Sequence, residues 1–174
     1  MTVRFAILTV SDRSSSGERA DSSGPALEQV IVEQGWQVGR KEILPDDEPL
    51  LRDMLTAWAD SGTVDVILTT GGTGFSPRDR TPEATAAVIE RPAPGLAEAM
   101  RLASLKMTPH AMLSRATAGI RGRSLIVNLP GSPKGAVENL KVILPVLAHA
   151  VQLLSEDPGA EAGHRALHDA NGGD

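Results

Sequence analysis

Unbroken apolar runs alternate along this chain with segments that carry helix start and stop signals. The runs at residues 4–10, 64–68 and 124–129 are almost wholly apolar, which is typical of strands buried on both faces of a parallel sheet. A more polar run at residues 36–44 predicts a strand at the edge of the sheet. Proline, glycine or acidic residues at helix start and stop positions predict helices over residues 25–34, 46–59, 81–89, 95–107 and 132–154.

This order of elements predicts an α/β fold. Strands that alternate with helices form a parallel sheet covered on both faces, so we expect a three-layer α/β/α sandwich with a mostly parallel sheet. The 174 residues suit one domain, which we place at residues 1–156. Residues 157–174 are largely Gly, Ala, acidic and His residues, a composition that predicts a flexible tail. The short, Gly-punctuated segment at residues 114–122 indicates a hairpin.

Composition and charge exclude several classes of function. With 41% hydrophobic and 22% charged residues, the chain has the composition of a soluble globular protein. A net charge of −5, with two Phe, two Trp and no Tyr, argues against nucleic acid as a partner. Because Cys is absent, the chain has no disulfide, thiolate metal site or Cys nucleophile. No window approaches the ~18 uninterrupted apolar residues of a membrane span, so we expect no membrane partner and a cytoplasmic protein.

Three of the predicted strands end in loops rich in polar residues, Gly or Pro. Their sequences are SDR at residues 11–13, TGGTG at 70–74 and NLPG at 128–131. Because the carboxyl ends of parallel strands meet at one rim of a sheet, we expect these loops to converge there and form a ligand site. The polar segment at residues 11–24 is longer than a simple connection requires, which also favours a functional loop.

The glycine-rich loop at residues 69–79, TTGGTGFSPRD, is the most informative of these segments. Its three glycines allow positive φ and close approach of a ligand, so that exposed N–H groups can surround an anion. A tight turn alone would explain one or two glycines, but three within four residues favour a binding loop. The spacing matches neither a P-loop nor a dinucleotide-binding motif. Ser76, Arg78 and Asp79 then supply a hydroxyl, a bidentate cation and a carboxylate.

Two aspartates, Asp46 and Asp79, each lie just beyond a predicted strand end. Facing each other across the rim, they would suit Mg²⁺, which takes a few carboxylate oxygens and completes its octahedron with water and substrate phosphates. The alternative is that Asp46 only caps a helix and that Asp79 only pairs with Arg78. For either residue alone the two interpretations carry equal weight, and the neighbouring anion-binding loop favours the metal site.

Other polar residues give weaker evidence for a ligand site. PGSPK at residues 130–134 puts a hydroxyl and a Lys at a predicted helix N-terminus, which suits an anion but is also an ordinary helix start. The Ser-Arg pair at 114–115 and the RGR segment at 121–123 would bind anionic groups or simply be solvated. His110 and His149 have no acidic or Ser partner nearby in the sequence, so a hydrolase triad has no support.

Together these motifs resemble the molybdopterin adenylyltransferase family of molybdenum cofactor biosynthesis, which has the MogA/MoaB-type fold also found in the gephyrin G domain. The matching segments occur in the family's order and cover nearly all of residues 4–154. They are SDR at 11–13, PDD at 45–47, TTGGTGFSPRDRTPEAT at 69–85, PGLAEAMR at 94–101, LSRATAG at 113–119 and NLPGSPK at 128–134. Arg80 stands where the family often carries an apolar residue, a difference that we interpret as one of packing.

The resemblance implies a reaction and a set of site residues. Molybdopterin and ATP, with Mg²⁺, would give adenylylated molybdopterin and pyrophosphate. By their match to the PDD and SPRD motifs, Asp46 and Asp79 are implied to be the catalytic, metal-holding carboxylates. The loop from Asp21 to Ser23 is implied to line the same pocket. The substrate-binding residues carried over are Ser11, Asp12, Thr70, Gly71, Gly72, Thr73, Gly74, Ser76, Arg78, Ser114, Asn128, Pro130, Gly131, Ser132 and Lys134.

The resemblance also implies a homotrimer and a transient contact with a molybdenum insertase. In the implied reaction a phosphate that is already ionised attacks ATP, so positioning and charge neutralisation dominate and no general base is needed. Two other interpretations stay open, a molybdopterin-binding carrier without catalysis and a trimeric scaffold of the same fold. The presence of both aspartates favours the enzyme over the carrier, and the short chain speaks against the scaffold.

Overall fold

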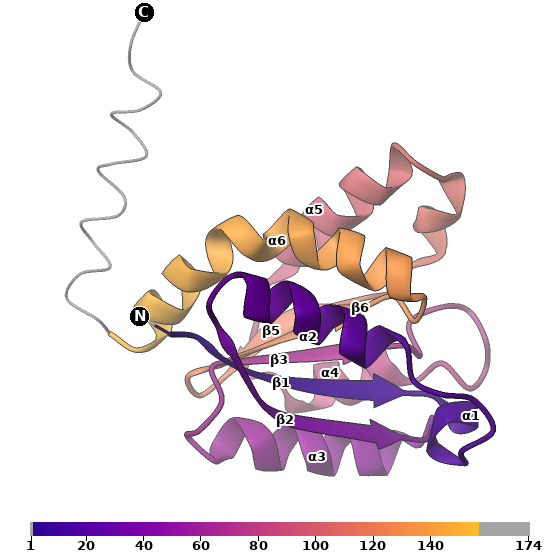
Figure 1. The fold of residues 1–174 in the computed structure, drawn as a ribbon, viewed down its shortest axis with the longest axis horizontal. Coiled ribbons are helices and arrows are strands. Elements are labelled where there is room, and N and C mark those ends of the chain that lie inside the picture. The colour runs from indigo at the N-terminus through magenta and orange to yellow at the C-terminus, as the bar shows by residue number, and fades with distance from the viewer. Residues whose placement is uncertain (1, 157–174) are drawn as a thin grey trace, which may run out of the picture.

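A six-stranded sheet lies between two layers of helices in the computed structural model, which describes residues 2–156 (Figure 1). The strand order is β2-β1-β3-β6-β5-β4. β2, β1, β3 and β6 are parallel to their neighbours, whereas β5 and β4 run antiparallel at one edge, so the prediction of a mostly parallel α/β sheet is confirmed. The strands are β1 (Arg4–Val10), β2 (Gln37–Leu44), β3 (Val66–Thr70), β4 (Arg91–Pro92), β5 (Ala118–Arg121) and β6 (Ser124–Leu129).

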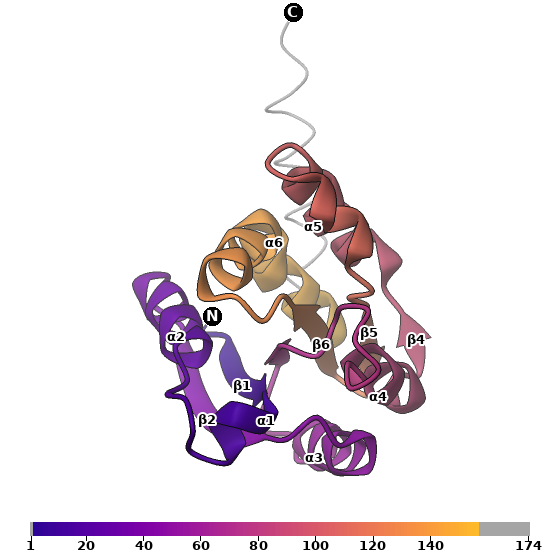
Figure 2. The ribbon, with the colours of Figure 1, turned by 90° about the vertical axis from the view of Figure 1, so that its right-hand side faces the viewer.

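The helices divide between the two faces of the sheet, which gives the expected three layers. α2, α5 and α6 cover one face, and α3 and α4 cover the other (Figure 2). The helical elements are α1 (Asp12–Ser15), α2 (Ser23–Glu33), α3 (Glu48–Asp60), α4 (Thr81–Val88), α5 (Pro94–Leu105), the 3-10 helix η1 (Pro109–Leu113) and α6 (Pro133–Leu154).

The hydrophobic core lies on both faces of the sheet, and this explains the unbroken apolar runs. In β1, Phe5 and Ile7 pack with the α2 and α6 layer, whereas Ala6 and Leu8 pack with the α3 and α4 layer. Successive side chains of a strand point to opposite faces, so a strand covered on both sides needs apolar residues at every position. β2 lies at the sheet edge, as expected, and most of its residues are exposed.

Three local expectations are corrected by side-chain contacts. The predicted loop after β1 contains the short helix α1, because the Ser11 hydroxyl accepts a hydrogen bond from the Ser14 N–H. α2 begins two residues earlier than predicted, where the Asp21 carboxylate accepts from the Ser23 and Gly24 N–H groups. Thr81 is the first residue of α4 rather than its cap, and its hydroxyl donates to a backbone carbonyl of the glycine-rich loop.

The expected hairpin and the long last helix are both present. β5 pairs antiparallel with β6, so the hairpin spans residues 118–129 rather than 114–122. Among residues 2–156, α6 is the one helix long and apolar enough, by length and composition alone, to cross a membrane. Its buried side, with Leu140, Ile143 and Leu147, packs on the sheet, as in the core helix of a domain. The predicted tail at residues 157–174 lies outside the described part of the chain.

Candidate functional site

The carboxyl ends of β1, β3 and β6 meet at one rim of the sheet, which faces the viewer in Figure 2. A cavity of about 510 Å³ opens between the loops that follow these strands, and we call it the carboxylate cavity. The convergence of loops expected from the sequence therefore produces an actual hollow. Its lining residues are Thr9, Val10, Ser11, Ser14, Arg19, Ala20, Asp21, Ser22, Ser23, Asp46, Thr70, Gly71, Gly72, Asp79, Gly131, Ser132 and Pro133.

The two predicted catalytic aspartates both line this cavity, on either side of the glycine-rich loop. A Cβ atom on Gly72 would lie 2.9 Å from Asp46 Oδ1, and one on Gly74 would lie 2.9 Å from Asp79 Oδ2. Each carboxylate thus packs directly against a glycine of the loop, although Asp46 and Asp79 come from different segments of the chain. Their catalytic and metal-holding roles stay predictions.

The backbone of the glycine-rich loop turns sharply at its first two glycines. Gly71 and Gly72 have φ angles of 104° and 65°, which side-chain-bearing residues rarely adopt. Within residues 2–156, the N–H groups of Gly72, Thr73 and Gly74 have no protein acceptor. Three unpaired donors in succession are the feature expected of an anion-binding loop.

An ion pair between Asp12 and Arg78 lies beside Asp46. Arg78 Nε and Nη2 donate to the two Asp12 carboxylate oxygens at 3.1 and 2.8 Å. The Asp12 N–H donates to Asp46 Oδ2 at 3.2 Å, and the Asp46 N–H donates back to Asp12 Oδ1 at 3.0 Å. The Arg78 guanidinium holds the pKa of the Asp12 carboxyl below its ordinary value. In this structure Arg78 is therefore paired with Asp12, and the ion pair joins the segment after β1 to the segment after β3.

Asp46 has the opposite electrostatic environment. Partial burial raises the pKa of its carboxyl above the ordinary value, and the charges of Asp12 and Asp79 raise it further, against a lowering hydrogen bond from the Asp12 backbone. The ionised form of Asp46 is thus disfavoured by its surroundings, and a nearby cation would stabilise it. This environment suits a divalent ion better than a simple helix cap, a role that Asp47 fills instead by accepting from the Leu50 N–H.

The raised pKa predicts a pH-dependent gain in stability for Asp46→Asn. The folded state binds the Asp46 proton more tightly than the unfolded chain, so stability is lost as pH rises through the raised pKa. At neutral pH the variant should unfold at a higher temperature, with a gain of less than about 1 kcal/mol because solvent screens this half-buried group. The gain should be smaller at about pH 4, near the ordinary pKa of an Asp carboxyl, because protonation of the wild-type side chain removes the charge that burial disfavours. Calorimetry at the two pH values measures it.

Asp60→Asn is the matched control with the opposite sign. The Arg121 guanidinium lowers the pKa of the Asp60 carboxyl, so this variant should unfold at a lower temperature than the wild type at neutral pH. If Asp46→Asn also lowered the unfolding temperature at neutral pH, the assigned environment of Asp46 would be wrong.

A second cavity, also of about 510 Å³, adjoins the first and shares Ser132 with it. It lies between the glycine-rich loop, the end of α5, η1 and the start of α6. The residues that line the second cavity are Thr73, Gly74, Arg101, Ser104, Met107, Thr108, His110, Ala111, Leu113, Ser114, Pro130, Ser132, Lys134, Gly135, Glu138 and Asn139.

Most of the predicted substrate-binding residues line one of the two cavities. Asp12, Ser76 and Arg78 border the site without lining either cavity, and Asn128 does not reach it at all. Those in the carboxylate cavity are Ser11, Thr70, Gly71, Gly72, Gly131 and Ser132, and those in the second cavity are Thr73, Gly74, Ser114, Pro130, Ser132 and Lys134.

The placement of Asn128 corrects its predicted role. Its side chain is fully buried, its amide donates to the hydroxyls of Thr69 and Thr85 at 2.9 and 2.8 Å, and its carbonyl accepts from the Thr117 N–H. Both donors of the amide group are used inside the protein. Asn128 therefore ties β6 to β3 and α4, and any effect on the ligand is indirect.

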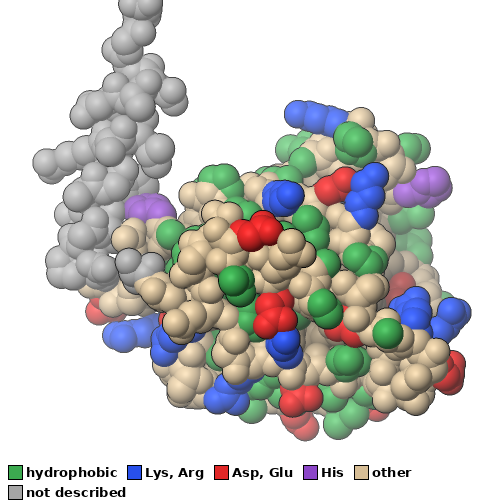
Figure 3. All heavy atoms as spheres, viewed as in Figure 1, with side chains coloured by type: hydrophobic (Ala, Val, Ile, Leu, Met, Phe, Trp, Pro, Cys, Tyr) green, Lys and Arg blue, Asp and Glu red, His purple; other side chains and the backbone are tan. Residues whose placement is uncertain are grey.

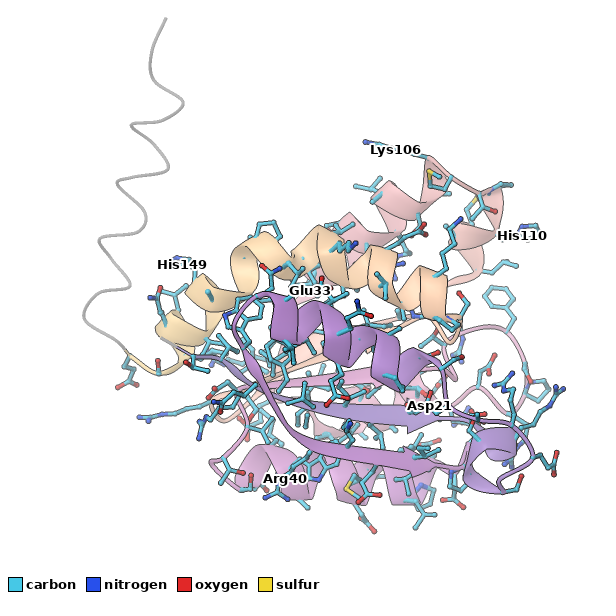
Figure 4. All side chains as sticks on the ribbon, in the orientation of Figure 1. Asp21, Glu33, Arg40, Lys106, His110 and His149 are labelled. Atoms are coloured by element: carbon cyan, nitrogen blue, oxygen red, sulfur yellow. The ribbon has the colours of Figure 1, made fainter. Side chains whose placement is uncertain are left out.

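Three basic residues that line the cavities were not predicted as site residues. Arg19 lines the carboxylate cavity, where its Nη2 donates to the Ser11 hydroxyl at 3.3 Å. Arg101 and His110 line the second cavity, and Figure 4 shows His110 beside the end of α5. The length of the polar loop at residues 11–24 was a signal for Arg19 and the PGLAEAMR segment was a signal for Arg101, but no quoted motif included His110.

Comparisons with known proteins agree with this geometry. Residues 6–149 match the family model described as "Probable molybdopterin binding domain". A molybdopterin adenylyltransferase of Helicobacter pylori (strain J99) is 42% identical over 155 residues, which cover 88% of this chain and 88% of that protein. The molybdenum cofactor synthesis protein cinnamon of Drosophila melanogaster is 43% identical over 159 residues, which cover 90% of this chain, but the chain spans only 26% of that protein.

A solved structure shows the same fold. The crystal structure of the molybdopterin biosynthesis enzyme MoaB from Thermus thermophilus superposes with a TM-score of 0.85 at 52% sequence identity. The match covers 90% of this chain and 99% of that one. The overall fold is thus a known architecture.

Proposed function

Because the chain belongs to the molybdopterin-binding domain family of molybdenum cofactor biosynthesis, we propose that it is a molybdopterin adenylyltransferase. The observation that carries the proposal is the carboxylate cavity, where Asp46 and Asp79 flank a loop with three unpaired N–H donors. The relative from Helicobacter pylori bears this enzyme name and matches this chain along most of its length.

In the proposed reaction the terminal phosphate of molybdopterin attacks the α-phosphorus of ATP. A new phosphorus–oxygen bond forms, the bond between the α-phosphorus and its bridging oxygen breaks, and pyrophosphate leaves with that electron pair. Several negative charges come together, so the protein's task is to place the phosphates in line and to stabilise their charge. The free N–H groups of Gly72, Thr73 and Gly74 are suited to hold phosphate oxygens without moving a proton.

The residues present also fit Mg²⁺. Asp46 and Asp79 offer two carboxylates, as Mg²⁺ sites on phosphate substrates commonly do. Partial burial, and after it the charges of Asp12 and Asp79, raise the pKa of Asp46. Residues 2–156 hold no group of three or more His, Cys, Asp and Glu side chains arranged around a common metal position, so the remaining ligands would be water and phosphate oxygens. When bound, Mg²⁺ would neutralise phosphate charge and ease departure of pyrophosphate.

The proposal is tested by incubating the pure protein with molybdopterin, ATP, Mg²⁺ and inorganic pyrophosphatase, followed by chromatography of the pterin. We expect adenylylated molybdopterin to accumulate with time and enzyme concentration. If the folded protein binds molybdopterin but forms no such product, it is a carrier of the pterin. If it neither binds the pterin nor forms the product, the assignment fails.

We also propose that the protein is a homotrimer that contacts a molybdenum insertase transiently. Support for self-association comes from large apolar side chains exposed on and beside α5 and η1, the region at the upper right of Figure 3. Light scattering of the purified protein measures the subunit number. The exposed side chains are Leu102, Leu105, Met107, Met112 and Leu113.

A further inference from the structure

Arg115 lies beneath the loop that carries Asp79 and bonds to both ends of it. Its Nε donates to the Gly74 carbonyl at 2.7 Å, and its Nη2 donates to the Asp79 carbonyl at 2.6 Å. Its backbone N–H donates to the Thr73 carbonyl at 2.9 Å. One residue, far from the loop in sequence, thus connects the segment before Phe75 with the segment after Arg78.

The guanidinium is itself held in place by Glu83 in the first turn of α4. Nη1 and Nη2 both donate to the Glu83 carboxylate, and Arg115 holds the pKa of the Glu83 carboxyl below its ordinary value. The two side chains are 34% and 30% exposed, so the pair is partly shielded from water. A planar group with several fixed N–H donors can serve a carboxylate and two carbonyls at once.

The loop between these two carbonyls is also held at Arg78, whose side chain bonds Asp12 and whose N–H donates to the Ser76 hydroxyl. At Asp79 itself, the Ser76 N–H donates to Asp79 Oδ2 at 3.0 Å, and the Asp79 N–H donates to the Ser76 carbonyl at 2.9 Å. These bonds fix where the Asp79 carboxylate points only if the two ends of the loop stay at their present separation. Arg115 bonds the carbonyls at both ends.

We propose that Arg115, oriented by Glu83, is a positioning residue that sets the place of the Asp79 carboxylate in the carboxylate cavity. The expected effect on the reaction rate rests on the proposed function, whereas the expected effect on the structure of the loop does not. The side chain of Arg115 lines neither the carboxylate cavity nor the second cavity, so it acts through the loop rather than on the substrate.

The test is Arg115→Lys, which keeps the charge but replaces the planar group by a single ammonium that cannot bridge both carbonyls. We expect kcat to fall about 10–100-fold, as for other residues that orient a metal-holding group. The Mg²⁺ concentration for half-maximal rate should rise by a similar factor. KM for molybdopterin should change less than about threefold, because Arg115 lines neither cavity. Glu83→Gln, which keeps an acceptor, should show a smaller change in the same direction.

A second measurement is independent of catalysis. Amide hydrogen exchange of Arg115→Lys should quicken at Ser76 and Asp79, whose N–H groups close the loop, while exchange in the strands stays as in the wild type. If the wild type proves inactive, the proposed function fails and the exchange measurement still judges the role of Arg115.

Arg121→Lys is the matched control. Arg121 also bonds one carboxylate, Asp60, and one carbonyl, that of Val88, but it lies at the opposite end of β5. The Arg121→Lys substitution should leave kcat, the Mg²⁺ dependence and amide exchange at Ser76 and Asp79 unchanged. The proposal is overturned if Arg115→Lys behaves like Arg121→Lys, or if it raises KM for molybdopterin while kcat and the Mg²⁺ dependence stay constant.

Discussion

Asp79→Asn should lower the rate of adenylyl transfer by about 10²–10³-fold, the effect of removing one preorganised charged or polar group from a transition state. The substitution keeps the size of the side chain and its acceptor for the Ser76 N–H, but it removes one of the two charges that flank the glycine-rich loop. Asp46→Asn should have an effect of the same order. The measurement is the product assay under saturating ATP, molybdopterin and Mg²⁺.

Binding of molybdopterin should survive both substitutions, because removal of a negative charge does not weaken the hold on an anion. Equilibrium binding of the pterin to each variant tests this point. Asp60→Asn, an exposed acid near the opposite rim, is the control and should keep the wild-type rate. Full activity of Asp46→Asn or Asp79→Asn, or loss of pterin binding in both, would contradict the assigned role of the two carboxylates.

Gly72→Ala should destabilise the protein and slow the reaction together. The φ angle of 65° alone costs an L-residue about 1–2 kcal/mol. The new Cβ would also lie 2.3 Å from the Thr81 hydroxyl oxygen, which is buried and donates to the Gly71 carbonyl, and 2.9 Å from Asp46 Oδ1. Relief of this crowding should cost about 1–3 kcal/mol more. Urea unfolding measures the total.

Gly62→Ala separates the two contributions. Gly62 has nearly the same φ angle, 66°, but a Cβ there would meet no atom within 4 Å. It should therefore show the cost of the backbone angle alone and keep the wild-type rate of transfer. Gly72→Ala should in addition lose up to about 10²-fold in rate, because Asp46 is displaced. Equal unfolding free energies for the two variants would show that the loop has room that the structure does not reveal.

The sequence predicted the architecture and the convergence of the rim loops well. β1 and β6 have the predicted bounds, and β2 and α3 lie within one or two residues of theirs. These elements follow from the burial of alternate residues and from start and stop signals, which are local properties of the chain. The convergence of the three loops needed one further rule, that parallel strands end at a common rim.

Side-chain contacts of single residues were predicted less well, because polar side chains near the rim have several partners within reach. Asn128 follows an apolar run and precedes Pro130, which places it at the rim by sequence, yet its side chain turns inward to Thr69 and Thr85. Arg80 was interpreted as a packing difference, but its guanidinium donates to the Glu48 carboxylate at 2.9 and 2.7 Å. It thereby joins the start of α3 to the loop that carries Asp79.

The amino-acid sequence by itself determined the layers, the convergence of three loops at one rim and the family to which the chain belongs, because periodicity and ordered motifs are carried by neighbouring residues. Only the tertiary structure decided that Arg78 pairs with Asp12, that Asp46 packs against Gly72 and that Arg115 lies under the Asp79 loop. These contacts join residues 26–66 positions apart. Their geometry depends on how whole elements pack and on which of several polar partners each side chain reaches, and no local pattern records either.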